Sequence, residues 1–148
     1  MEFDVIVDTR QVNKVLDSLR TKLLNWSDGM EAVGSAFKQY YATKPFASRG
    51  SVFGSVWPDL QPAYASYKAR KFPGRPILVA TGAMAQGFDF TANSDQVKVF
   101  NPVDYFEKHQ KGESVPQRTS MALNSELKQM AQDILQKDLQ AKMRGLGL

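Results

Sequence analysis

The 148-residue chain has no cysteine and a single histidine, His109. The lack of cysteine excludes disulfide frameworks, thiolate zinc sites, iron–sulfur clusters and a cysteine nucleophile. A metal site with one histidine would have to depend on carboxylates. Asp104, Glu107 and His109 are close in sequence, but a helix places the histidine off the face that the two acids share. We therefore expect no metal site.

Motifs of catalysis and cofactor binding are also missing. The sequence has no Gly-x-x-x-x-Gly-Lys phosphate loop and no Gly-x-Gly-x-x-Gly fingerprint, and residues 50–54 (GSVFG) have the wrong spacing for a nucleophile turn. The acidic residues are few and dispersed, which disfavours a pair of carboxylates for acid–base chemistry. We expect neither an enzyme nor a cofactor.

Long apolar runs are absent as well. No stretch approaches the roughly 18 apolar residues that a membrane span needs, and residues 1–8 lack the basic region and apolar core of a secretory signal. Hydrophobic residues make up 43% and charged residues 23%, as in ordinary soluble domains. The composition predicts one soluble domain over residues 1–148, made in a cytoplasm and without a membrane partner.

The excess of positive charge is confined to one part of the chain. The formal net charge is +4, yet residues 37–86 contain seven basic residues against Asp59 alone, a net of +6. Such a segment faces either phosphate or an acidic partner, or it is a solvated surface. Both interpretations remain open at the level of sequence.

The N-terminal half predicts a strand and two helices. Alternation over residues 3–7 is typical of a short strand. Thr9 is a suitable N-cap for a helix, and Asp28 with Glu31 resembles a capping box for a second helix that Pro45 ends. The apolar face of the first helix comprises Val12, Val15, Leu16, Leu19, Leu23 and Trp26, and that of the second Met30, Val33, Phe37 and Tyr40 or Tyr41.

The C-terminal half predicts a hairpin between helices. Pro62 is suited to the first turn of a helix over residues 62–71, and alternation on both sides of residues 93–95 predicts a β-hairpin near 87–100. A short helix at 104–111 closed by Gly112 and a final helix from about 124 to 143 follow. The class is α+β, a small antiparallel sheet packed by N-terminal and C-terminal helices.

Two segments leave alternatives open. The predicted loop over residues 46–59 places Phe46, Val52, Phe53 and Val56 among small residues, so it either packs between neighbouring subunits or covers its own core. In the helix over 62–71, aromatic and basic side chains interleave as they do on nucleic-acid-binding surfaces. We favour instead an arrangement in which the tyrosines pack inward and the lysines extend to water. The side chains in question are Tyr64, Tyr67, Lys68 and Lys71.

Four stretches together resemble a known family. They are residues 57–68 (WPDLQPAYASYK), 77–84 (ILVATGAM), 105–112 (YFEKHQKG) and 115–118 (VPQR). In this order they are similar to the virion morphogenesis or tail-completion family of tailed bacteriophages, including its Mu-like members. The resemblance runs from about residue 57 to the final helix. Relatives commonly continue the last motif with proline and bulky apolar residues, whereas this chain has residues 119–121 (TSM).

The resemblance implies a structural role in the virion. Proteins of this family look like neck or tail-completion proteins that form a ring, six-fold in the expected case, around the DNA channel at the head–tail junction. Assembly would take place in the bacterial cytoplasm. The implied partners are further copies of the chain, a head-side adaptor or connector, and tail terminator, tube or sheath proteins, with genomic DNA passing through without sequence-specific binding. A tail terminator that caps the tube is the alternative within this class, and a basic nucleic-acid-binding module is the alternative outside it.

The resemblance also implies roles for the matching residues. Gly82 and Gly112 would permit left-handed backbone, and Thr81 would cap a short helix. His109, Gln110 and Arg118 would hydrogen-bond across the turn between the short helix and a following strand, while Trp57 and Leu60 would anchor the loop. The full set of expected fold or interface positions is Trp57, Leu60, Tyr64, Lys68, Leu78, Thr81, Gly82, Tyr105, His109, Gln110, Gly112, Pro116 and Arg118.

Overall fold

The computed structural model describes residues 9–148. Its class is the predicted α+β, with helices and a two-stranded antiparallel sheet. The strand expected at residues 3–7 lies outside the described residues. The elements are α1 (Thr9–Leu24), α2 (Ser27–Ala47), the 3₁₀ turn η1 (Ser51–Phe53), α3 (Pro62–Lys71), α4 (Ala83–Gln86), β1 (Asp89–Ala92), β2 (Val97–Phe100), α5 (Phe106–Lys111) and α6 (Ser125–Gly145).

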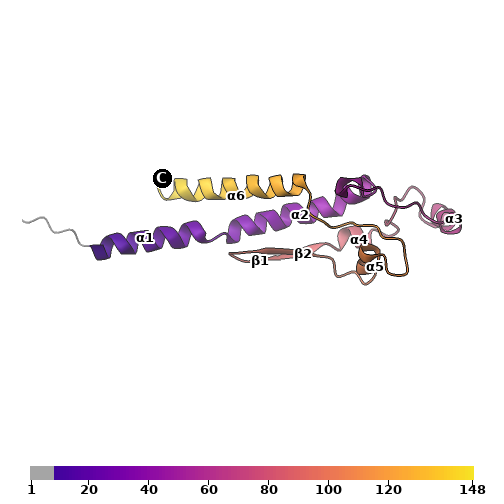
Figure 1. Ribbon diagram of the computed structural model, residues 1–148, viewed down its shortest axis with the longest axis horizontal. Helices are drawn as coiled ribbons and strands as arrows, with labels where there is room; N and C mark the ends of the chain where they lie inside the picture. The colour runs from indigo at the N-terminus through magenta and orange to yellow at the C-terminus, as the bar shows by residue number, and fades with distance from the viewer. Residues whose placement is uncertain (1–8) are drawn as a thin grey trace, which may run out of the picture.

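The molecule is elongated, and α2 is its axis (Figure 1). Helix α1 continues the line of α2 outward, and α6 runs back along both. The β1–β2 hairpin packs on α2, and α3, α4 and α5 gather at the end opposite α1. The two ends of the protein are therefore built from different parts of the chain.

Helix α2 supplies five of the twelve buried apolar side chains of the described core, because apolar residues recur along it at helical spacing. Of the predicted inner face, Val33, Phe37, Tyr40 and Tyr41 are buried and Met30 is half-buried. The ring of Tyr41 stacks on Phe88, with centroids 5.7 Å apart. The remaining buried apolar side chains of the described core are Phe46, Trp57, Ile77, Val79, Met84, Phe88, Phe106 and Leu127.

The predicted hairpin is present with the predicted turn. Asp89 pairs with Phe100 and Ala92 with Val97 in an antiparallel register. The Oδ1 atom of Asn93 accepts hydrogen bonds from the backbone N–H groups of Asp95 and Gln96, at 2.8 and 2.9 Å, which fixes the turn.

The sequence interpretation was wrong at both ends of α2. The helix begins at Ser27, one residue before the expected cap, and the Oδ1 atom of Asn25 accepts from the Ser27 N–H instead. Asp28 lies in the first turn. Pro45 does not end the helix but lies buried inside it. A proline this close to the C-terminal end removes only one helical hydrogen bond, so two more residues remain helical.

The expected loop over residues 46–59 is more ordered than predicted. Phe46 belongs to α2 and lies in the core, and residues 51–53 form η1. Val52 and Phe53 are half-buried. Of the four apolar residues, Val56 alone is classed as exposed, with 63% of its surface accessible. Residues 46–59 therefore mainly cover the hydrophobic core of the same chain.

Helix α3 has the predicted bounds but the opposite orientation. Tyr64 and Tyr67 are 47% and 43% exposed, and Lys68 is 4% exposed. The expectation of inward tyrosines and outward lysines is thus wrong for these three residues. The reason is that the Nζ atom of Lys68 turns inward to donate to the carbonyl of Pro76, while the tyrosine rings pack on each other at 6.1 Å.

Helix α1 is present as predicted, but the N-terminal part of its apolar face is not covered. None of its residues is buried. Val12, Val15 and Leu16 are each about half exposed or more, and only Leu19 and Leu23 are half-buried. An amphipathic helix whose apolar stripe faces water is unusual in a complete fold.

Candidate functional site

A cavity of about 520 Å³ lies at the end of the molecule that carries α3, α4 and α5. Ten of the thirteen positions singled out by the family resemblance line this cavity, although they come from four separate stretches of the chain. These are Leu60, Tyr64, Lys68, Leu78, Thr81, Gly82, Tyr105, His109, Pro116 and Arg118. Trp57, Gln110 and Gly112 do not line it and instead hold the segments that do.

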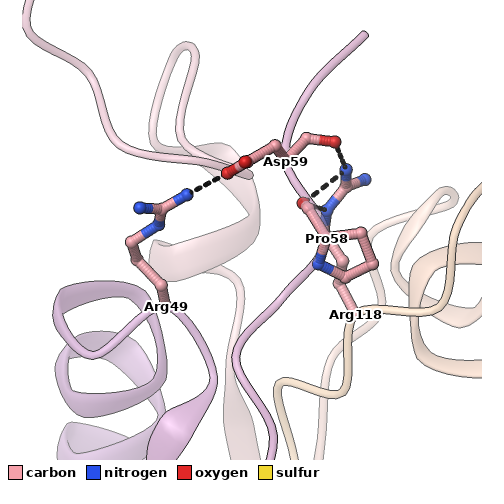
Figure 2. Close-up of polar contacts among 4 residues, drawn as sticks. All are labelled: Arg49, Pro58, Asp59 and Arg118. Carbon is pink, nitrogen blue, oxygen red and sulfur yellow. Dashed lines mark hydrogen bonds and ion pairs between the residues drawn. The ribbon is translucent and has the colours of Figure 1, made fainter.

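Arg118 joins two of these segments. Its side chain is 4% exposed, and its Nε and Nη2 atoms donate to the carbonyl of Pro58 at 3.0 and 2.9 Å. Nη2 also donates to the carbonyl of Asp59 at 3.1 Å. Figure 2 shows that the carboxylate of Asp59 points the other way, to Nη2 of Arg49 at 2.5 Å. Backbone carbonyls rather than a carboxylate therefore hold the buried guanidinium.

Lys68 is the second buried cation. Its ammonium group donates to the carbonyl of Pro76, and no carboxylate of residues 9–148 lies within ion-pair distance of it. Burial lowers the pKa of Lys68, and the positive charge of Arg118 lowers it further. The cavity thus holds two buried cations.

His109 contributes an unused polar atom. Its buried Nδ1 has no hydrogen-bond partner, and its ring meets Tyr105 edge-on at 6.3 Å. Burial lowers the pKa of His109, and Arg118 adds to the effect. The imidazole is consequently neutral at pH 7.

The loop before α4 forms one wall of the cavity, and two of its residues have left-handed backbone conformations. Gly82 has φ +88, and Leu78 has φ +63, in the left-handed region that a branched side chain rarely adopts. The Oγ1 atom of Thr81 accepts from the Ala83 N–H at 3.3 Å, at the start of α4. The expected left-handed glycine is found, but the N-cap position of α4 is Gly82 itself, and Thr81 accepts this bond from one residue further out.

The segment after α5 is held by Gln110. The Oε1 atom of Gln110 accepts from the N–H groups of Ser120 and Met121, and its Nε2 donates to the carbonyl of Met121 at 2.6 Å. Gly112 ends α5 with φ +78. The strand expected after this turn is absent, since residues 116–124 belong to neither a helix nor a strand.

Trp57 anchors the same segment from the other side. It is buried against Phe46, and its Nε1 donates to the carbonyl of Thr119 at 2.8 Å. His109 departs from the expected role, because its side chain makes no bond across the turn; only its carbonyl accepts, from the Arg118 N–H.

Sequence reasoning missed a second polar cluster. Asn124 donates from Nδ2 to the hydroxyl of Tyr40 and to the carbonyl of Val52, and its Oδ1 caps α6 by accepting from the Leu127 N–H. Tyr41 donates to the carbonyl of Ala122. The Asn-Ser-Glu start of the last helix was visible as a capping signal, but its long-range partners were not.

The described residues thus form an α+β fold with two candidate functional sites. One is the cationic cavity at the end that carries α3, α4 and α5, and the other is the exposed part of the apolar face of α1 at the opposite end. Among the described residues, no three or more metal-ligating side chains cluster, and no helix has the length and hydropathy to span a membrane. Residues 7–140 match the model of the phage virion morphogenesis family, and the chain belongs to this family. The match includes the N-terminal helices, which the sequence motifs did not reach.

Neither the curated proteins nor the solved structures contain a significant match. Family membership indicates a structural or morphogenetic role in the phage virion and associates the protein with the virion.

Proposed function

We propose that the protein is a neck or tail-completion subunit that assembles into a ring around the DNA channel at the head–tail junction. The observation that carries the proposal is the uncovered apolar face of α1. Val12, Val15 and Leu16 lie on one side of a helix that continues beyond the body of the subunit. A face of this kind is stabilised when a neighbouring subunit covers it.

A ring requires that each copy contact its two neighbours through two different surface patches. Contact between unlike surfaces of successive copies is heterologous, and it closes into a ring when the rotation between copies permits. The family resemblance supports a six-fold ring, with a head-side adaptor or connector on one side and the tail terminator, tube or sheath on the other. A tail terminator that caps the tube would use the same arrangement.

The test is a charge placed on the face of α1. Val15→Glu should abolish the oligomer in size-exclusion chromatography with light scattering while leaving the melting temperature of the subunit unchanged, because Val15 is 59% exposed within it. Lys14→Glu introduces the same carboxylate at an exposed position on the opposite side of α1 and should assemble normally. Equal assembly of both variants would contradict the role of α1.

A second candidate function is favoured by the outward tyrosines of α3. Tyr64 and Tyr67 are exposed side by side, and the Nζ atom of Lys71 lies 5.6 Å from the centroid of the Tyr67 ring. Exposed aromatic rings with adjacent cations suit nucleic-acid bases and phosphates. If the protein binds DNA through α3, affinity should fall steeply with salt and Tyr67→Ala should weaken it. A neck ring should show little affinity for free DNA at any salt concentration.

A further inference from the structure

The cavity contains two almost fully buried cations, since Lys68 and Arg118 are each 4% exposed. Among the described carboxylates, that of Asp59 acts on Arg118 but is exposed and paired with Arg49, and none forms an ion pair with Lys68. Burying a charge that is not fully compensated is costly. An ammonium group has three donors, of which Pro76 accepts from one. The lining of the cavity also includes the apolar side chains of Leu60, Leu78 and Met84. The cavity is therefore complementary to a carboxylate flanked by apolar side chains.

One segment of this chain has that composition. Residues 1–8 (MEFDVIVD) contain three carboxylates, five apolar side chains and no basic side chain. We propose that the cavity of one subunit binds residues 1–8 of a second copy, with a carboxylate of the segment meeting Lys68 and Arg118.

The occupant has to come from another copy because of distance. Eight residues span at most roughly 29 Å even when fully extended. Helices α1 and α2 are 16 and 21 residues long and follow one line, so the path from Thr9 to the middle of α2 alone is roughly 40 Å. The cavity lies at the far end, with α3, α4 and α5. A subunit cannot fill its own cavity with its own first residues.

The resulting contact joins the α1 end of one copy to the α3–α5 end of the next. This is a heterologous contact of the kind that closes into rings. The inference rests on the proposed function, because the binding of residues 1–8 supplies a contact that such a ring needs. The same contact places α1 of each copy alongside the neighbouring copy.

Cross-linking tests the contact directly, because the chain has no cysteine of its own. One pool of full-length protein carries Val5→Cys, which keeps the three carboxylates of residues 1–8, and the other carries Gln61→Cys at an exposed position that lines the cavity. A short bismaleimide should give a dimer of the two pools. The matched control pairs Val5→Cys with Lys98→Cys, an exposed residue of the hairpin, and should give none. Equal yields from both pairs, or no dimer from either, would overturn the inference.

A peptide measurement separates this inference from the proposed ring. A labelled peptide of residues 1–8 should bind the full-length protein, and replacing its three acidic residues by amides should weaken binding about tenfold or more, since bonds between charged groups are lost. Lys68→Met should weaken binding of the acidic peptide similarly. Peptide binding by a chain that stays monomeric would contradict the proposed ring but support the binding of residues 1–8 by the cavity. A ring whose assembly the amide substitutions Glu2→Gln, Asp4→Asn and Asp8→Asn leave unchanged would overturn the inference and retain the ring.

Discussion

Arg118 links the segment that precedes α3 with the segment that follows α5. Its three hydrogen bonds end on the carbonyls of Pro58 and Asp59, some sixty residues away in sequence. These carbonyls have no strand partner, so the guanidinium satisfies backbone groups that would otherwise be left without a bond. At this scale the family-motif residues act by fixing irregular backbone around the cavity.

Arg118→Ala should destabilise the fold by about 2–4 kcal/mol, because the change removes the buried side chain that joins the two segments, takes the donors from the carbonyls of Pro58 and Asp59, and opens space in the cavity wall. Urea denaturation gives the free energy of unfolding. Arg49→Ala is the matched control, since Arg49 also contacts Asp59 but through an exposed ion pair. Its effect should stay below about 1 kcal/mol. Similar losses for the two variants would contradict the role of Arg118.

The single histidine predicts a pH dependence. Burial lowers the pKa of His109 below 6.5, so the unfolded chain takes up a proton before the folded one does. Stability should therefore be full well above pH 6.5 and fall as the pH is lowered through 6.5 toward 5.5. Arg118 and Tyr105 are the charged and titratable groups that face the ring.

His109→Phe should remove this pH dependence without loss of stability at pH 7.5, since Nδ1 has no partner to lose. Thermal melts of both proteins across the range make the comparison. An equally steep decline in the variant would assign the pH dependence to other groups.

At the scale of elements, α2 organises the fold by packing on α6, the hairpin and α4. Gly34 is the closest point of contact with the hairpin, because a Cβ there would lie 2.2 Å from Cδ2 of Phe90. A side chain at this position would push β1 away from the helix.

Gly34→Ala should accordingly cost about 1–3 kcal/mol of unfolding free energy. Gly145→Ala is the control, in the last turn of α6 with nothing within 4 Å of the added atom. That change should alter stability by less than about 0.5 kcal/mol. A neutral Gly34→Ala would show that the hairpin adjusts freely on α2.

Local signals were sufficient for several elements. Pro62, the turn at Asn93 and the apolar stripe of the last helix predicted α3, the hairpin and α6, because each depends on neighbours in sequence. The path of α2 through Pro45 and the burial of Lys68 were not predictable in this way. They depend on the packing of the last helical turn and on the carbonyl of Pro76, which folding brings into place.

The candidate site shows the same division. Motif resemblance named ten of the residues that line the cavity, but nothing local indicated that four stretches converge on one hollow. The inward turn of Lys68 and the outward tyrosines of α3 were likewise set by tertiary contacts. The uncovered face of α1 was invisible in sequence, because an apolar stripe looks the same whether its own subunit or a neighbour covers it.

The whole molecule is an elongated subunit with unlike ends, an apolar helix at one and a cationic cavity at the other. Membership of the phage virion morphogenesis family places it in virion assembly. In the proposed ring, each copy would contact its neighbours through these two unlike ends.

Native mass spectrometry of the purified full-length chain over a range of concentrations tests the proposed ring most directly. The account predicts one closed oligomer, whose mass is a fixed multiple of the 16.6 kDa chain and does not grow as concentration rises. For a six-fold ring the multiple is six. A 16.6 kDa monomer at every concentration, or an open-ended ladder of masses, would contradict it.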